Sequence, residues 1–108
     1  MAPDDNKRPS QSAEIPCNNL DEVRRNIDHL DRELVTIIAL RGKYVAQAAT
    51  FKTSTEDVKA PQRVEAVIHK VRTLAQEAHT SPDLVEAVWR AMIAHFTATE
   101  IAEFKKLQ

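Results

Sequence analysis

Four charged residues of the 108-residue chain stand where the surrounding pattern predicts apolar or connecting residues. Arg41 interrupts a run of apolar residues, and Glu100 lies on an apolar stripe near the C-terminus. Lys52 and Arg63 enclose the polar segment 53–59 and the Ala-Pro that follows it. Because burying an unpaired charge is costly, such residues are expected either to pair with each other or to meet a charged ligand. The three cations together could surround one small anion.

Each of these residues has an alternative interpretation without a ligand. Arg41 could extend its charged end to solvent or pair across helices. Glu100 could form an interhelical salt bridge; in an apolar pocket its pKa would instead rise, and it would donate a hydrogen bond near neutral pH. Helical periodicity places Lys52 within about 20° of the face of Arg41. Arg63 opens a predicted helix whose backbone N–H groups favour anions, although either cation alone could simply be solvated.

Arg24 is a fifth candidate, and its position has a geometric consequence. It lies 17 residues before Arg41, or about 25 Å along a helix and about 100° around it. Asp21 and Asp28 flank it, so a local ion pair is the alternative to ligand binding. If Arg24 and Arg41 contact one small molecule, one of them must come from a second chain.

The pattern that positions these residues predicts one long helix. Its apolar residues alternate at spacings of three and four, the heptad pattern, interrupted only at Arg41. Asn19 is a candidate N-cap, with Glu22 three residues later. About 30 residues make a helix of about 45 Å, whereas a compact domain of this size has a radius of gyration of about 13 Å. The helix is therefore expected to pack against a second copy. The seam consists of Leu20, Val23, Ile27, Leu30, Leu34, Ile37, Tyr44, Ala48 and Phe51.

Two further helices follow a loop at residues 53–59. Pro61 suits the first turn of the second helix, and Ser81 with Pro82 at N1 starts the third. Three helices and no strand predict an all-α bundle, with a flexible tail at 1–18 and one helical domain at 19–108. Gly42 costs a helix interior about 1 kcal/mol relative to Ala, so it either permits a close approach beside Arg41 or is neutral.

Composition narrows the function further. With a single glycine, the chain cannot form a Gly-rich phosphate-binding loop. A net charge of −1 does not indicate a broad basic face for binding nucleic acid. No apolar run approaches a membrane span of roughly 20 residues, and the N-terminus lacks a secretory apolar core. Cys17 is alone, which favours a reducing cytoplasm. The four histidines lack metal-ligand spacing, so neither a metal nor a cofactor is expected.

In this setting the stretch "LDEVRRNIDHLDRELVTIIALRGKYVAQAATFK" resembles the first helix of the all-helical (class II, AroQ-type) chorismate mutases. The family's helix-start arginine, its L/I-D-x-L/I-D motif, its second arginine and its final lysine match Arg24, residues 27–31, Arg41 and Lys52. "APQRV" supplies Arg63 at the loop-arginine position, and Glu100 falls where the family has Gln or Glu. The resemblance covers about residues 17–104. It implies an intertwined homodimer with two equivalent sites, each taking Arg24 from one chain and the other residues from its partner.

One position separates two branches of that family. Dedicated mutases usually carry a Glu directly after the loop arginine, where it holds the ring hydroxyl of the substrate; here the residue is Val64. Together with "APxRV", "YVxxA" before "FK" and "C-x-x-L", it resembles the isochorismate-pyruvate lyases of salicylate and siderophore synthesis, which retain weak mutase activity. Glu100 departs from the Gln usual in that branch, and this bears on efficiency at neutral pH.

The resemblance implies a ring dicarboxylate, isochorismate or chorismate, as substrate. Arg24 and Arg41 would each bind a carboxylate, and Arg63 would help close the loop over the ring carboxylate. Lys52 and Glu100 would donate hydrogen bonds to the enol-ether oxygen as its C–O bond breaks. Both possible reactions are pericyclic and need no nucleophile, metal or cofactor. A dedicated chorismate mutase and a non-catalytic dimeric scaffold or ligand-sensing module remain alternatives.

Overall fold

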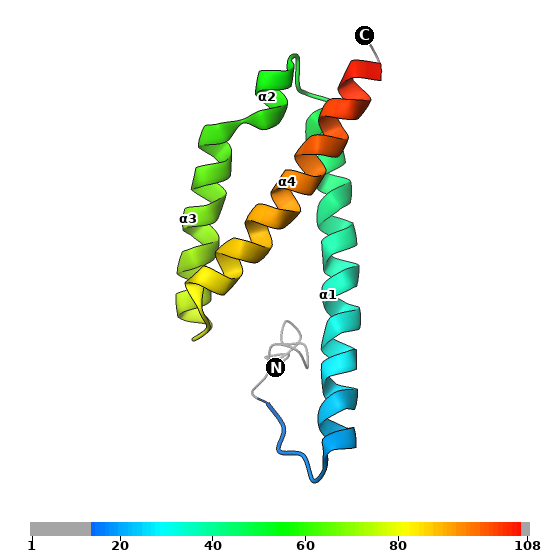
Figure 1. Ribbon diagram of the computed structural model, residues 1–108, viewed down its shortest axis with the longest axis vertical. Coiled ribbons are helices and arrows are strands. Elements are labelled where there is room, and N and C mark those ends of the chain that lie inside the picture. Colours follow the sequence, from blue (N-terminus) through cyan, green and yellow to red (C-terminus); the bar gives the residue numbers. More distant parts are fainter. Residues whose placement is uncertain (1–13, 107–108) are drawn as a thin grey trace, which may run out of the picture. The chain divides into compact units, whose positions relative to one another are not determined.

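The computed structural model describes residues 14–106 of the chain, and all of its regular elements in that range are helices. They are α1 (Leu20–Ala49), α2 (Thr55–Lys59), α3 (Pro61–Glu77) and α4 (Pro82–Lys106) (Figure 1). The predicted all-α class is thus confirmed. Of the predicted tail, residues 1–13 lie outside the described range, and residues 14–19 precede α1 without regular secondary structure.

Helix α1 begins at the predicted cap. The Oδ1 atom of Asn19 accepts a hydrogen bond from the backbone N–H of Glu22 at 2.9 Å. The Glu22 carboxylate accepts in return from the backbone N–H of Asn18, also at 2.9 Å. This is a capping box whose return bond is displaced by one residue from the usual N-cap position. It satisfies one donor that the first turn leaves free and the N–H of the residue before the cap.

The C-terminal end of α1 corrects the predicted placement of Lys52. The helix ends at Ala49. The next three backbone N–H groups, of residues 50, 51 and 52, each bond to the carbonyl three residues earlier, at 3.1 Å. Such bonds tighten the chain beyond α-helical geometry. Lys52 therefore lies after the helix, and its direction cannot be inferred from the α-helical period.

The segment predicted as a loop contains a helix, which is a second correction. Ser54 caps α2, because its Oγ atom accepts from the backbone N–H of Asp57 at 3.1 Å. Ala60 ends α2 in the left-handed region, with φ 37°. Pro61 then starts α3, as predicted. Helix α4 also starts as predicted, since the Ser81 hydroxyl accepts from the backbone N–H of Leu84 at 3.1 Å.

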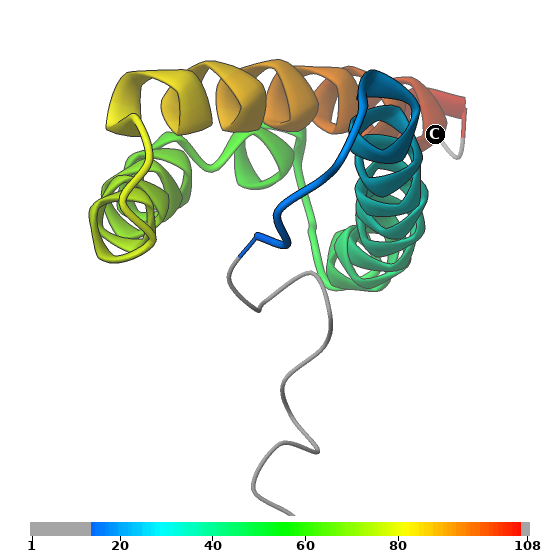
Figure 2. The same ribbon diagram turned by 90° about the horizontal axis from the view of Figure 1, so that it is seen from below.

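Contacts divide the chain into two compact units, Met1–Arg41 and Gly42–Gln108, so that α1 begins in the first unit and ends in the second. In the second unit α2 and α3 pack on the same side of α4 (Figure 2). The most buried apolar side chains of the described residues come from α2 and α3: Val58, Ile68, Val71 and Ala75.

An ion network joins α3 to α4. The Arg90 guanidinium binds the Glu65 carboxylate through both Nη atoms, at 3.0 and 3.1 Å, and Glu86 through Nε at 2.6 Å. Arg72 contacts Glu86 at 2.7 Å and Asp83 at 3.0 Å. These bonds hold the pKa of the Glu65 and Glu86 carboxyls below their ordinary value. The network adds polar contacts between α3 and α4, away from the C-terminal end of α4.

No side chain of α1 is buried in the single chain. Its apolar seam is open to solvent along the helix, with exposed fractions from 38% at Val23 to 58% at Leu20 in the first unit. Tyr44, in the second unit, is 64% exposed. A continuous apolar stripe of this length is unusual on a monomer and is typical of an interaction surface. None of the helices within 14–106 has the length and apolar character to cross a membrane.

Candidate functional site

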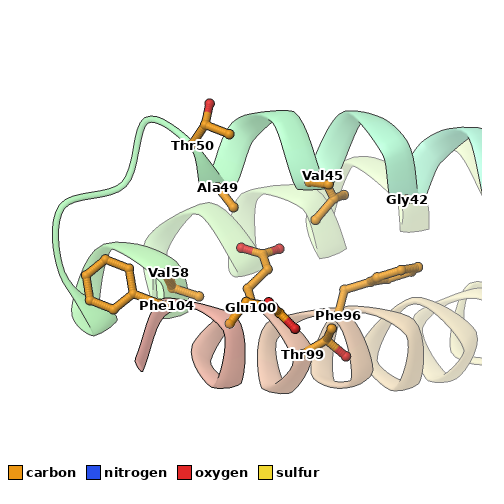
Figure 3. Close-up of a pocket in the computed structure, with 11 residues that line it drawn as sticks. Gly42, Val45, Ala49, Thr50, Val58, Phe96, Thr99, Glu100 and Phe104 are labelled. Carbon is orange, nitrogen blue, oxygen red and sulfur yellow. The ribbon is translucent and has the colours of Figure 1, made fainter. Parts of the chain in front are cut away.

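A pocket of about 390 Å³ lies in the second unit, between the last turns of α1, the helix α2 and the C-terminal half of α4. Its volume is within the range of small-molecule sites, roughly 300–1,000 Å³. Its wall is largely apolar, with a few polar groups near Glu100 (Figure 3). The lining residues are Gly42, Val45, Ala46, Ala49, Thr50, Val58, Phe96, Thr99, Glu100, Glu103 and Phe104.

Gly42 forms one end of this pocket because the ring of Phe96 packs directly against it. A Cβ atom at position 42 would lie 3.0 Å from the Cε1 and Cζ atoms of Phe96, closer than ordinary van der Waals contact. Figure 3 shows the ring directed toward the Gly42 backbone. Of the two interpretations of this glycine, the close approach is confirmed, with the aromatic ring of α4 as the neighbour.

Glu100 is the ionisable group whose placement fits its predicted role best. Its side chain extends from α4 into the space facing Val45 and Ala49 of α1 (Figure 3). Desolvation raises the pKa of the Glu100 carboxyl above its ordinary value, and the positive charge of Lys52 opposes that rise in part. The apolar surroundings therefore shift the Glu100 carboxyl toward its protonated form, which is the direction that the sequence predicts.

Lys52 is near enough to influence Glu100, and its ammonium group is anchored. Its Nζ atom donates a hydrogen bond to the backbone carbonyl of Asp57 at 2.9 Å. The neighbouring Thr53 donates from both its backbone N–H, at 3.1 Å, and its hydroxyl, at 2.6 Å, to the Asp57 carboxylate. These bonds lower the pKa of Asp57, mainly through the Thr53 hydroxyl. The two hinges of the polar segment thus differ, because Lys52 is held and Arg63 is exposed in the first turn of α3.

Arg24 and Arg41 belong to the first unit, both on α1. Arg24 is exposed and Arg41 half-buried. Their separation of 17 helical residues is about 25 Å. One chain thus brings Lys52 and Glu100 together and keeps the two arginines of α1 apart.

The ion pairs considered as alternatives are not formed within the described chain. Among residues 14–106, none of Arg24, Arg41, Lys52, Arg63 and Glu100 takes part in a salt bridge. Over the same residues, no cluster of three or more potential metal ligands is found.

Sequence reasoning missed several residues of the site. Thr99 and Glu103 flank Glu100 on α4, and Thr50, the residue after α1, also lines the pocket. Glu103 follows Glu100 at i+3, a spacing that puts both on one helix face and could have indicated it. The contacts of Asp57 depend on α2, which has no periodic apolar pattern to reveal it.

Comparison with known proteins identifies the family of the chain. The family model for chorismate mutase type II matches residues 23–101. The isochorismate pyruvate lyase of Pseudomonas aeruginosa is 29% identical over 90 residues, covering 83% of this chain and 89% of that protein. The T-protein of Haemophilus influenzae is 35% identical over 82 residues, which are 75% of this chain and 22% of that longer protein. With most of its length matched and an all-helical fold, the chain belongs to the chorismate mutase type II family.

Proposed function

We propose that this protein is an isochorismate-pyruvate lyase that also has chorismate mutase activity. The observation that carries the proposal is Glu100, which sits in a largely apolar pocket with a raised pKa and with the positive charge of Lys52 nearby. A carboxyl whose pKa is raised in that pocket, with a cation near it, would suit a substrate atom that gains negative charge. The likeness to the lyase of Pseudomonas aeruginosa supports the same reaction class.

In the proposed mechanism, Lys52 and protonated Glu100 donate hydrogen bonds to the enol-ether oxygen. The C–O bond to that oxygen breaks while a ring hydrogen moves to the enolpyruvyl arm, which gives salicylate and pyruvate from isochorismate. No external base takes the proton, because the transfer is intramolecular. The protein contributes by holding the arm over the ring and by stabilising the charge that develops on oxygen.

The carboxylates of the substrate would bind to the arginines. Arg41 and Arg63 would bind them from the same chain as Lys52, and Arg24 would come from a second copy. Two observations support such a homodimer with shared sites. The α1 seam is exposed in the single chain, and about 25 Å of helix separates Arg24 from Arg41. A small molecule cannot bridge that distance within one chain.

A dedicated chorismate mutase is the second candidate, because the family match itself favours it. The residue that argues against it is Val64, half-buried in the first turn of α3 and directly after Arg63. An apolar side chain there cannot hold a ring hydroxyl by a hydrogen bond. The candidates share their cationic site and differ in this contact.

The proposal is tested by incubating the full chain separately with isochorismate and with chorismate. Salicylate fluorescence reports the lyase reaction, and loss of chorismate absorbance with prephenate formation reports the mutase reaction. We expect salicylate to form with the higher kcat/KM. Faster conversion of chorismate would assign the protein as a mutase. Turnover of neither substrate would favour a non-catalytic scaffold or ligand-sensing module.

A substitution at position 64 separates the two activities. Val64→Glu should raise the ratio of mutase to lyase kcat/KM by roughly ten-fold, since one hydrogen bond to a substrate hydroxyl is worth about 1–2 kcal/mol. Val64→Ile keeps the residue apolar and is the matched control. An unchanged ratio in Val64→Glu would mean that this residue does not choose between the substrates.

A further inference from the structure

The anchoring of Lys52 depends on an unusual backbone carbonyl. In a continuing helix the carbonyl of Asp57 would accept from the N–H of residue 61, but residue 61 is proline and has no N–H. The backbone N–H of Ala60 bonds to Glu56 instead. The Asp57 carbonyl is therefore free to accept the Lys52 ammonium, at 2.9 Å.

The side chain of Asp57 holds this arrangement in place. Its carboxylate accepts two bonds from Thr53, the residue next to Lys52, at 3.1 Å from N–H and 2.6 Å from the hydroxyl. Helix α2 has only five residues, too few to be stable by itself. Packing of Val58 holds α2 against α4, and the contacts of Thr53 with Asp57 tie the carbonyl of residue 57 to the residue next to Lys52.

We propose that Asp57, acting with Thr53, is a positioning residue that holds the Lys52 ammonium ready for the substrate. An ammonium group has three N–H donors, and one bond to the Asp57 carbonyl leaves two for a ligand. A lysine side chain loses rotamer entropy when it is fixed. Anchoring it before the substrate binds removes that cost from the reaction step.

This inference rests on the proposed role of Lys52 and is tested by a double-mutant cycle. Asp57→Ala should lower kcat roughly ten-fold while KM changes less than about two-fold, a fraction of the roughly 100-fold that a 1 Å misplacement can cost. The same substitution in a Lys52→Ala background should have no further effect on kcat. An equal loss in both backgrounds would overturn the proposal, because Asp57 would then act without Lys52.

Two further variants guard against a general structural effect. Thr53→Val removes the 2.6 Å hydroxyl bond without changing charge or size, and should lower kcat about three-fold, in line with one net hydrogen bond of about 0.7 kcal/mol. Glu56→Gln removes a charge from the same short helix but touches only Lys59, at 3.5 Å. It should leave kcat unchanged. A loss in Glu56→Gln equal to that in Asp57→Ala would contradict a role specific to the Thr53–Asp57 contact.

A measurement without substrate keeps this inference separate from the proposed function. Because the Lys52 charge lowers the pKa of Glu100, the Glu100 carboxyl reports where Lys52 lies. Followed by ¹³C NMR of labelled glutamate, its midpoint should move to higher pH in Thr53→Val and in Lys52→Ala, and no further in the double variant. No shift in Thr53→Val would overturn the positioning role. If the Glu100 midpoint shifts as expected but the protein is inactive toward both substrates, only the proposed enzymatic function would be refuted.

Discussion

Replacing Gly42 with alanine sets two effects of similar size against each other. Alanine in place of glycine inside a helix contributes about 1 kcal/mol to stability. The added Cβ atom would lie 3.0 Å from two atoms of the Phe96 ring, which must move by a few tenths of an ångström. Overpacking costs typically 1–3 kcal/mol, and the half-buried Phe96 beside a pocket has room to yield, so the lower end applies. The free energy of unfolding should change by less than about 1 kcal/mol.

Catalysis should respond more strongly than stability, because Phe96 and Gly42 both line the pocket. A ring displaced by a few tenths of an ångström should lower kcat/KM roughly three- to ten-fold, given that about 1 Å can cost 10²-fold. Urea unfolding at one fixed protein concentration measures the first effect, and steady-state turnover measures the second.

The control is the same substitution in a Phe96→Leu background, where the ring edge is gone. There Gly42→Ala should stabilise the fold by the full value of about 1 kcal/mol. If Gly42→Ala in the parent chain already gives that full gain, with unchanged kcat/KM, the contact with Phe96 does not limit the space at position 42. Gly42 would then not be required for the close approach of the Phe96 ring.

Three further substitutions test other parts of the site. Lys52→Ala should lower kcat by about 10²-fold or more, as for the loss of one donor to a developing charge, with a smaller change in KM; equal kcat in the two proteins would exclude its role. Glu100 has a raised pKa and donates only when protonated, so activity should fall as pH rises through that pKa. In Glu100→Gln the pH–rate profile should lose this decline, and coinciding profiles would contradict a protonated donor. Leu30→Asp, in mid-seam, should convert a dimer to monomers in analytical ultracentrifugation, whereas Ala39→Asp, nine residues on and half a turn round the helix, should not; a dimeric Leu30→Asp would move the interface elsewhere.

The sequence predicts the fold well where local chemistry determines it. Asn19, Pro61 and Ser81 mark the starts of three helices through capping and proline geometry, both of which act over a few residues. The five-residue α2 was not predicted, because helical periodicity can be recognised only over a longer window. Its signal was the pair Ser54 and Asp57, a serine followed three residues later by an acid, which resembles a capping box.

The site is less predictable because it depends on contacts between elements. The proposed donor role of Glu100 agrees with its pocket, since a carboxyl on an apolar stripe implies desolvation. The predicted direction of Lys52 assumed that the helix continues to residue 52, and this assumption was wrong. The tightened turn after Ala49 cannot be inferred from an apolar pattern. The partner of Gly42 required knowing which side chain of α4 faces it, which is a tertiary contact. The roles of Arg24, Arg41, Lys52, Arg63 and Glu100 in binding or catalysis all stay predictions.

Ala60 is the single residue that connects α2 to α3. It ends α2 and caps the start of α3, with φ 37° and ψ 61°. An L-residue in this left-handed region costs roughly 1 kcal/mol, and the only glycine of the chain is at position 42. With no slack between the helices, α2 can turn relative to α3 only through the two torsions of Ala60. Adding one residue here would therefore rotate Val58 away from the core, so the length of this connection should tolerate insertions poorly even though it lies in what reads as a loop.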